Sequence, residues 1–397
     1  MVRCDMRCYI RHDTLVFSMI QFTNQNTGER YTISVVPMEK ALVMKAAGQV
    51  FYDYTKLTAV NTCPTYGVLR YALHKTEVPL NTHGRKMALE SGSACHEYYA
   101  ALRYWTILER ADCEGWPMDE IHKKVGMRLF SEERLTSMYA IPQDSDRINN
   151  AQLFALDALH SSGFYDDPSD RKRTMSNLEA SCLAYTYEYF KRDMPILVRD
   201  DLIGIEVPFV LEVLKESRGG FIDYDQAAYY CGRIDGIQLW NNRPIVCENK
   251  TSGMSIASSN AWRMAFALSN QVTGYCIAGS ALLGESIREA FVMGSQIPPP
   301  RNVFDGTVFE LCTRTDSDCV RWCEWFFHSV GTYEDFVPRV IDAPRYSHSC
   351  NRFFSACEFI PFCSMEREEQ QQVLDEMNID EWSPLDHLTE KTTEGAD

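Results

Sequence analysis

The hydrophobic positions along the chain repeat at two different spacings, and the spacing changes from one stretch to the next. Residues 14–24 and 30–38 are rich in β-branched and aromatic side chains and enclose the turn sequence Asn24–Glu29, which predicts a β-hairpin. Helical spacing dominates residues 54–200, and within them residues 86–110 form the most regular stretch. Strand patterns return in the second half of the chain. The alternation predicts an α/β protein.

The second half of the chain contains a predicted hairpin centred on the turn signal Asn241-Asn242. If this hairpin is symmetric about its turn, Asp235 and Glu248 are direct cross-strand partners with Cα atoms about 5 Å apart. Lys250 follows Glu248 by two positions and therefore lies on the same face of its strand. Two carboxylates and an ammonium group are thus predicted to point at one spot. That arrangement is suited to hold a hard divalent cation and to position an attacking water.

Predicted helices on both sides of this hairpin carry further polar side chains on single faces. In the regular helix before it, Gly92 and His96 are four positions apart and share a face. The glycine permits close approach of another backbone, and His96 then projects beside that contact. After the hairpin, one helix is predicted from about Ser258 to Gly279, with Gln271 and Tyr275 four positions apart on one face.

The remaining patterns predict alternating helices and strands. Residues 54–75 read as a helix, the pair Cys63-Pro64 and a second helix, and Cys63 taken alone is a packed cysteine. Residues 287–311 read as strands broken by prolines, and residues 316–336 read as a helix.

Composition limits the class of protein. The chain has 397 residues, of which 45% are hydrophobic and 24% charged, as expected of one to three folded domains. No apolar run approaches the roughly 18 residues that a membrane span needs. The first residues contain no apolar core of signal-peptide length, so a cytoplasmic location in a bacterium or phage-infected cell, without a membrane partner, is expected. In such a reducing compartment the 15 cysteines are buried thiols or metal ligands rather than disulfides.

The net charge of −16 argues against nucleic-acid binding, which usually requires a basic surface. The charge is concentrated, however, in the last residues. Residues 365–397 contain 11 acidic and 2 basic residues, a charge of −9, which leaves −7 for the rest of the chain. This tail is predicted to be a polar, partly helical or disordered appendage.

Three cysteines lie within one short, aromatic-rich stretch near the C-terminus. Cys350, Cys357 and Cys363 have the spacing C-x6-C-x5-C, which lacks the C-x2-C pair of common zinc knuckles. Their density indicates an iron–sulfur or zinc site, and three buried thiols are the alternative.

The residues of the hairpin also differ from chance matches in their context. An Asp, a Glu and a Lys at this spacing occur in many chains of this length. Two apolar strands joined by a tight turn rarely place such charges in mid-strand, because an unpaired buried charge costs several kcal/mol. A bound metal offsets that cost.

These motifs, taken in order, resemble the PD-(D/E)XK nuclease superfamily. The similarity is strongest to its RecB/AddB-type branch and to the related phage exonucleases and CRISPR-adaptation nucleases with an iron–sulfur cluster. The resemblance extends from Lys56 to Cys363 in scattered motifs. The matching motifs are Cys63-Pro64, Gly92-x3-His96-Glu97, Ile205-Glu206-Val207-Pro208-Phe209, Gly232-Arg233-Ile234-Asp235, Cys247-Glu248-Asn249-Lys250-Thr251, Gln271-x3-Tyr275, and the final three cysteines.

The resemblance implies a restriction-endonuclease-like core, in which helices flank a mixed central sheet. It also implies that Asp235 and Glu248, with His96 and the main-chain carbonyl of Asn249, bind one or two Mg or Mn ions. Lys250 would then orient or deprotonate the attacking water or neutralise developing charge.

For the remaining polar residues, the resemblance implies supporting roles. Gln271 and Tyr275 would position Lys250 and the DNA backbone. Cys63, Cys350, Cys357 and Cys363 would hold a structural 4Fe-4S cluster, and zinc or no metal are the alternatives. Two departures stand out. The last three cysteines are spaced more widely than the C-x2-C-x5-C of the AddB type. Asn249 replaces a usually apolar residue, which suggests a solvated strand end.

The implied function is a metal-dependent DNA nuclease, in the first instance an exonuclease of phage or mobile-element recombination or repair. It would act on single-stranded DNA or duplex ends, with any helicase or recombination partner a separate polypeptide, since no G-x4-G-K-[ST] loop is present. The alternatives are an inactive nuclease-fold DNA-binding or scaffold protein and a cluster-binding interaction module. The expected parts are an accessory β region (1–53), a helical region (54–200), the nuclease core (201–285), C-terminal strands, helix and cysteines (286–364) and the acidic tail (365–397).

Overall fold

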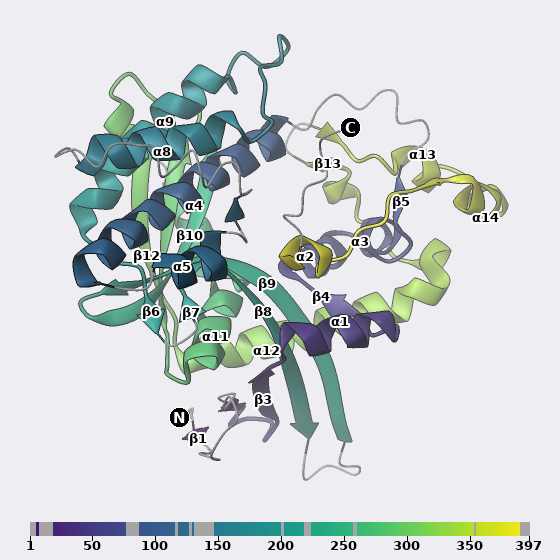
Figure 1. Ribbon diagram of the computed structural model, residues 1–397. Helices are drawn as coiled ribbons and strands as arrows, with labels where there is room; N and C mark the ends of the chain where they lie inside the picture. The colour runs from purple at the N-terminus through teal and green to yellow at the C-terminus, as the bar shows by residue number, and fades with distance from the viewer. Residues whose placement is uncertain are drawn as a thin grey trace.

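The computed structural model describes residues 5–7, 19–76, 87–115, 118–126, 129–130, 147–199, 202–217, 224–256, 260–352 and 355–389. Its centre is a mixed sheet in the order β1-β2-β3-β8-β9-β10-β11-β12, with the short β4 beside β9 (Figure 1). Neighbouring strands run antiparallel except for the pairs β10–β11 and β4–β9. The strands are β1 (Asp5–Arg7), β2 (Met19–Thr23), β3 (Arg30–Val35), β4 (Phe51–Tyr52), β8 (Ile205–Ser217), β9 (Tyr224–Trp240), β10 (Arg243–Ser252), β11 (Glu289–Gln296) and β12 (Thr307–Thr313).

Helices cover both faces of the sheet, as the α/β pattern predicts. One face packs on α4 (Met87–Glu114), α8 (Arg147–His160) and α9 (Met175–Arg192), which lie together in Figure 1. The other face packs on α2 (Tyr54–Thr62), α11 (Asn270–Leu283) and α12 (Asp316–Phe336). The sheet is therefore the middle of three layers, with an apolar core on each side.

The predicted hairpin around Asn241-Asn242 is confirmed. Both asparagines have positive φ angles, 50° and 60°, as the tight turns that join two twisted strands require. The strands pair in the register that runs from Arg243–Trp240 to Cys247–Gly236, which is symmetric about the turn. The next opposed positions in this register are Asp235 and Glu248.

Glu206 marks an irregularity where β8 meets β9. Its φ angle of 45° lies in the left-handed region, which is uncommon for a residue other than glycine. Before it, Ile205 packs on the α4 side of the sheet, whereas Val207, two positions later, packs on the α11 side. Side chains two apart on a regular strand share a face, so the strand changes phase at Glu206. Backbone strain of this kind is concentrated at functional sites.

The N-terminal hairpin is confirmed in its described part, because β2 and β3 pair antiparallel on either side of the turn at 24–29. The strands of the expected accessory β region (1–53) are part of the central sheet rather than a sheet of their own. β3 pairs with β8 over six residue pairs and thereby extends the central sheet. The reason is that the side chains of Tyr31 and Ile33 are fully buried, and the apolar core that buries them lies under the central sheet.

The single helix predicted after the hairpin is instead two helices, α10 (Asn260–Ala267) and α11. The first ends at Ala267, and the side chain of Ser269 caps the second by accepting a hydrogen bond from the main-chain N–H of Val272. Serine favours such a capping position over a helix interior. The two helices form the crossover that makes β11 parallel to β10.

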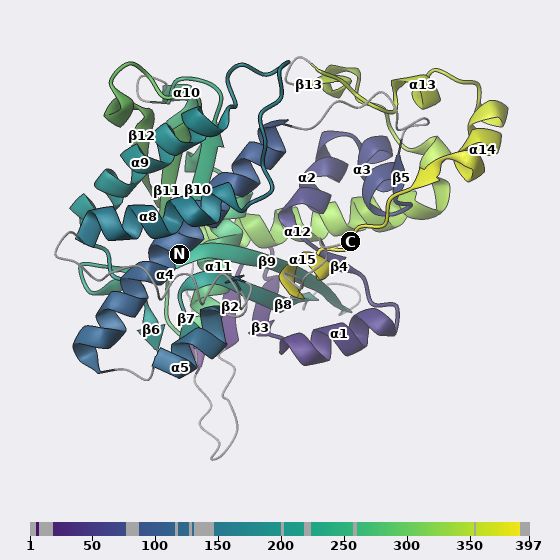
Figure 2. The same ribbon diagram turned by 45° about the horizontal axis from the view of Figure 1, so that its top comes forward.

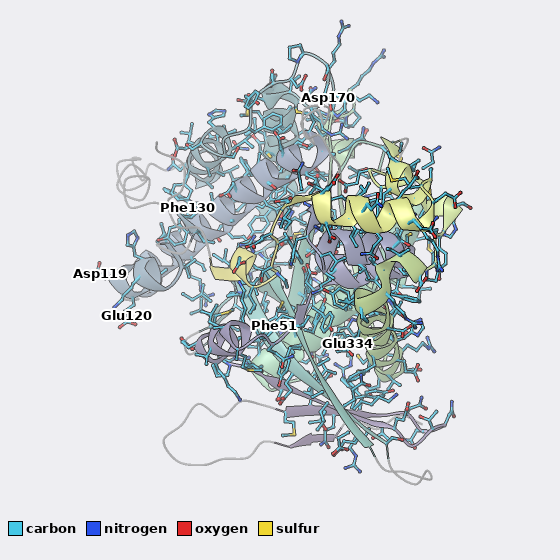
Figure 3. The ribbon with its side chains drawn as sticks, turned by 90° about the vertical axis from the view of Figure 1, so that its right-hand side faces the viewer. Phe51, Asp119, Glu120, Phe130, Asp170 and Glu334 are labelled. Carbon is cyan, nitrogen blue, oxygen red and sulfur yellow. The ribbon has the colours of Figure 1, made fainter. Side chains whose placement is uncertain are left out.

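The acidic tail is not a free appendage in its described part. Its helix α14 (Arg367–Glu376) is followed by β15 (Asn378–Ile379), which pairs with β5 (Lys75–Thr76). Leu385 is fully buried in a small cluster with Phe51, Val210 and Cys231 (Phe51 is labelled in Figure 3). Apolar residues within an otherwise charged segment thus attach it to the body. Residues 390–397 lie outside the described ranges.

The predicted pair of helices around Cys63-Pro64 is confirmed as α2 and α3 (Pro64–Tyr71), and the C-terminal elements lie beside them (Figure 2). The predicted helix 316–336 and the strands within 287–311 are also confirmed. The remaining elements are α1 (Met38–Ala46), α5 (Met118–Ile121), a π-helix (His122–Gly126), β6 (Val198–Arg199), β7 (Leu202–Ile203), short 3-10 helices (Val303–Gly306, Val337–Asp342 and Ser347–Ser349), β13 (Asn351–Arg352), β14 (Ser355–Ala356), α13 (Ile360–Cys363) and α15 (Asp386–Thr389). Among the described helices, none combines the length and the apolar character that crossing a bilayer requires.

Candidate metal centre

Three carboxylates lie in one row across the middle of the sheet. Asp235 is on β9, and the pairs Ile205–Gly236 and Val207–Ile234 place Glu206 of β8 opposite it. On the other side, the register of the hairpin places Glu248 of β10 opposite Asp235. All three residues are buried. The two strands that flank β9 therefore each bring one acid to Asp235.

The helix α4 adds a histidine to this row. The Nδ1 atom of His96 lies 3.5 Å from Oδ1 of Asp235. Ligand atoms of His96, Glu206 and Asp235 all lie within 4.8 Å of one another, and no other such group of three occurs among the described residues. Gly92, one turn before His96 on this helix, faces β10, because a Cβ atom added to it would lie 3.4 Å from the side-chain hydroxyl of Thr251. That is an ordinary contact with a side chain, and the predicted close approach of another backbone at Gly92 is not observed.

Each flanking acid has one oxygen that is paired and one that is not. Oε2 of Glu206 lies 2.9 Å from Nε of Arg233, and Oε1 of Glu248 lies 2.6 Å from Nζ of Lys250. The other oxygens, Oε1 of Glu206 and Oε2 of Glu248, are buried without a hydrogen-bond partner in the described structure. Unpaired buried carboxylate oxygens are rare and indicate an ion or water that completes the site.

The crowding of the acids changes their titration. Burial and the charge of Asp235 raise the pKa of Glu248 to about 8, against the opposing effect of Lys250. Burial and Asp235 also raise the pKa of Glu206, although the nearby Arg233 lowers it. Glu248 thus favours a proton at neutral pH in the absence of a cation, and the pKa of Glu206 is shifted in the same direction. A divalent ion would take the place of the proton on Glu248.

Lys250 is held by a chain of polar side chains from α11. Its ammonium donates a hydrogen bond to Oε1 of Gln271 at 2.9 Å, and the amide of Gln271 donates to the hydroxyl of Tyr275 at 3.2 Å. Burial and the charge of Glu248 raise the pKa of Tyr275 well above its ordinary value, so it stays protonated. The four-residue spacing of Gln271 and Tyr275 predicted that they share a helix face, and in the structure Gln271 contacts the lysine and Tyr275 contacts Gln271.

The interpretation of Asn249 as a solvated strand end is wrong, because this residue is fully buried. Its main-chain N–H donates a hydrogen bond to Oδ2 of Asp235 at 2.7 Å. Its side-chain oxygen accepts hydrogen bonds from Arg103 and from Tyr185 on the α4 side of the sheet. The predicted role of its main-chain carbonyl as a metal ligand stays a prediction.

Glu206 was not among the predicted site residues. The sequence contained a signal for it, an acid within the apolar run Ile205–Phe209 that matches a motif of the suggested family. Its place beside Asp235, however, depends on the pairing of β8 with β9 and on a left-handed backbone angle. Neither can be read from local sequence.

These residues fit a hard divalent cation. Carboxylate oxygens are the preferred ligands of Mg²⁺ and Mn²⁺, and a histidine nitrogen suits Mn²⁺ and related metals. Asp235 and Glu206 supply carboxylate oxygens within 4.8 Å of a ring nitrogen of His96. Glu248 lies outside this group of three, on the other side of Asp235, where its unpaired oxygen is available to a cation that lies closer to β10.

The four cysteines of the predicted cluster also come together. Cys63 lies between α2 and α3, and the main chain next to it, the carbonyl of Thr62, accepts a hydrogen bond from Ser349 at 2.7 Å. Burial raises the pKa of Cys363 to about 11, and Cys63, Cys357 and Cys350 contribute to the shift. A tetrahedral zinc site needs sulfur atoms about 3.8 Å apart, given Zn–S bonds of about 2.3 Å. No three of these thiols have sulfur atoms that all lie within 4.8 Å of one another.

A search of protein-family models and a search of curated proteins each found no match to this chain. The functional argument therefore rests on the residues and their geometry.

Proposed function

We propose that the protein is a divalent-metal-dependent DNA nuclease of the PD-(D/E)XK type, similar to the RecB/AddB branch. The observation that carries the proposal is the row of Glu206, Asp235 and Glu248 across three adjacent strands, with Lys250 against Glu248. Structural carboxylates do not usually crowd in this way, because each raises the pKa of the next. A bound cation would explain the arrangement, because its positive charge offsets the repulsion between the carboxylates.

The protein's own residues supply the groups that phosphodiester hydrolysis needs. A divalent cation bound by Asp235, Glu206, Glu248 and His96 would lower the pKa of a water and offset negative charge on the phosphate. Lys250 reaches the same point and holds its proton, so it can orient the attacking water or donate to the phosphate oxygens. Gln271 fixes the lysine in that position.

The fold supports the same proposal. The strands β8, β9 and β10 form an antiparallel meander, and α10 and α11 then cross over to the parallel strand β11. Helix α4, which carries His96, covers the opposite face from α11. A mixed sheet with helices on both faces agrees with the restriction-endonuclease-like core that the motifs imply.

A second metal group is part of the proposal. The four cysteines come from two regions nearly 300 residues apart, and Cys357 and Cys363 pack against the apolar cluster that joins α3 to the C-terminal elements. A 4Fe-4S cluster, held by four thiolates at wider spacing than zinc requires, fits this gathering better than a single zinc ion. Its role would be to attach the C-terminal elements to α2 and α3.

The decisive experiment incubates the purified protein with end-labelled single-stranded and double-stranded DNA in Mg²⁺, Mn²⁺ or EDTA. The proposal expects degradation that requires the metal and disappears in Asp235→Ala and Lys250→Ala. DNA binding without cleavage under any of these metals would instead favour an inactive nuclease-fold protein.

A further inference from the structure

A buried arginine lies directly behind the row of acids. Arg103 is on α4, seven residues after His96, and its side chain is fully buried. In the part of the chain that the structure describes, no carboxylate lies within ion-pair distance of its guanidinium. The guanidinium donates hydrogen bonds instead to two uncharged oxygens and to the sulfur of Met293. Burying a charge without a carboxylate partner is costly. Such a residue calls for a functional explanation.

The guanidinium joins β9 and β10, two of the three strands that carry the acids. Nη1 donates a hydrogen bond to the main-chain carbonyl of Asp235 at 3.1 Å, and Nη2 donates to Oδ1 of Asn249 at 3.1 Å. The planar group packs against Gly236, where an added Cβ would lie 3.1 Å from Nε. The glycine after Asp235 therefore makes room for the arginine.

The link occurs where the regular pairing of the strands stops. The main-chain ladder between β9 and β10 extends to Cys247–Gly236. Beyond it, the carboxylate of Asp235 accepts a hydrogen bond from the N–H of Asn249. Arg103 adds a second bridge at the same point, and Tyr185 holds Asn249 with a hydrogen bond of 3.0 Å.

We propose that Arg103 is a positioning residue, which fixes Asp235 and Asn249 relative to each other from behind the sheet. It also places a permanent positive charge near Asp235 and Glu206, because a guanidinium stays protonated in proteins. The polar residue at position 249, where the suggested family has an apolar one, is explained as the partner that Arg103 requires. This inference rests on the proposed metal site.

The test uses Mn²⁺ alone as the probe, with binding followed by the loss of the free-ion EPR signal. Arg103→Met is expected to weaken Mn²⁺ binding about tenfold or more and, if the protein cleaves DNA, to lower kcat about a hundredfold with little change in KM. Arg110→Met is the matched control, because Arg110 lies on the same helix and donates to the carbonyl of Ile196, away from the acids.

The double variant Arg103→Met/Asn249→Leu separates positioning from stability. Replacing both buried polar partners by apolar groups should restore part of the thermal midpoint lost in Arg103→Met, since the side chain at position 249 is then no longer an unpaired polar group. Mn²⁺ affinity should remain low, because Asp235 has lost its anchor. Wild-type Mn²⁺ affinity in the double variant would overturn the proposal.

If Arg103→Met does not fold, Arg103→Lys supplies the test. It keeps the charge but has only one donor group, so Mn²⁺ binding should weaken about threefold or more, and unchanged binding would contradict the positioning role. These affinities do not depend on cleavage. A wild-type protein that binds Mn²⁺ but leaves DNA intact would refute the nuclease proposal without deciding the role of Arg103.

Discussion

The carboxylate of Asp235 accepts a hydrogen bond of 2.7 Å from the main-chain N–H of Asn249, one step beyond the last regular pair of the β9–β10 ladder. A side chain thus takes the place of a main-chain acceptor at the centre of the sheet. The bond fixes one oxygen of Asp235 and leaves the other facing His96. This orientation is what a metal ligand needs, and it leads to the following expectations.

Removing the third acid should weaken metal binding. Glu206→Gln retains the size of the side chain but loses its charge, so Mn²⁺ affinity should fall about tenfold or more. The metal-free protein should keep its stability, because the change removes a buried carboxylate whose pKa is raised. Calorimetric titration with Mn²⁺ measures the first effect and thermal unfolding the second.

Glu212→Gln is the matched control for this variant, since Glu212 lies on the same strand and accepts a hydrogen bond from Tyr229 away from the site. Equal Mn²⁺ affinity in Glu206→Gln and Glu212→Gln would show that Glu206 is not a ligand.

Metal binding should strengthen as the pH rises from about 5 to about 8. In the metal-free folded protein the pKa of Glu248 is about 8, above its ordinary 4.5, so the ion must displace a proton within this window. Apparent affinity then rises by up to about tenfold per pH unit and levels off above pH 8. Titration with Ca²⁺ at pH 7, in two buffers of different ionisation enthalpy, should show release of close to one proton.

The same pKa shift fixes the sign of the stability change without metal. The folded state holds a proton that the unfolded state releases, so the free energy of unfolding falls as the pH rises from about 4.5 to about 8. A pH-independent Ca²⁺ affinity with no proton release would contradict the assignment of Glu248 to the metal site.

Lys250 should matter for the reaction rather than for metal binding. Lys250→Met is expected to lower kcat by about a factor of 10² to 10⁴ while the protein still binds Mn²⁺. Gln271→Leu should have a smaller effect, about tenfold, because Gln271 only orients the lysine. Single-turnover kinetics measure both variants.

A surface lysine on the same sheet provides the control. Lys215 on β8 forms an ion pair with Glu29 far along the strand from the acids, so Lys215→Met should cleave at the wild-type rate. A Lys250→Met enzyme as fast as Lys215→Met would remove the lysine from the proposed mechanism.

Replacing one cluster cysteine should release the iron and loosen the C-terminal elements. Cys357→Ser is expected to lack bound iron and acid-labile sulfide after anaerobic purification, and hydrogen exchange in α13 and α14 should become faster. Cys312→Ser serves as the control, because Cys312 is buried in the central core. Zinc in place of iron in the wild-type protein, or no metal at all, would contradict the cluster assignment.

Local sequence was sufficient to predict which residues of the hairpin oppose each other. It was insufficient to predict which residues from other strands and helices lie beside them. The two asparagines at 241 and 242 set the turn, and symmetry about that turn then set which residues oppose each other. Glu206 could not be placed in this way, because its strand pairs with β9 from outside the hairpin. The contact between Asn249 and Arg103 could not be predicted either, because Arg103 lies 146 residues earlier in the chain, on a helix.

The errors elsewhere have the same origin. The strands β2 and β3 looked self-contained in the sequence, but their buried face is completed by the core under β8. The acidic tail reads as a polar, partly helical or disordered appendage because its charges dominate the composition, whereas a few apolar residues, among them Met377 and Leu385, pack against the body. Long-range packing of a few side chains decided both cases.

The most direct test of the central claim compares wild-type protein with two substitutions on the same strand, Asp235→Asn and Asp225→Asn. Each removes one charge, but Asp225 is exposed near the far end of β9. Metal-stripped protein is supplied with Mn²⁺ and end-labelled DNA, and product formation is followed. The metal-site account predicts cleavage by wild type and Asp225→Asn, none by Asp235→Asn, and none without Mn²⁺. Undiminished cleavage by Asp235→Asn, or cleavage that persists in EDTA, would contradict it.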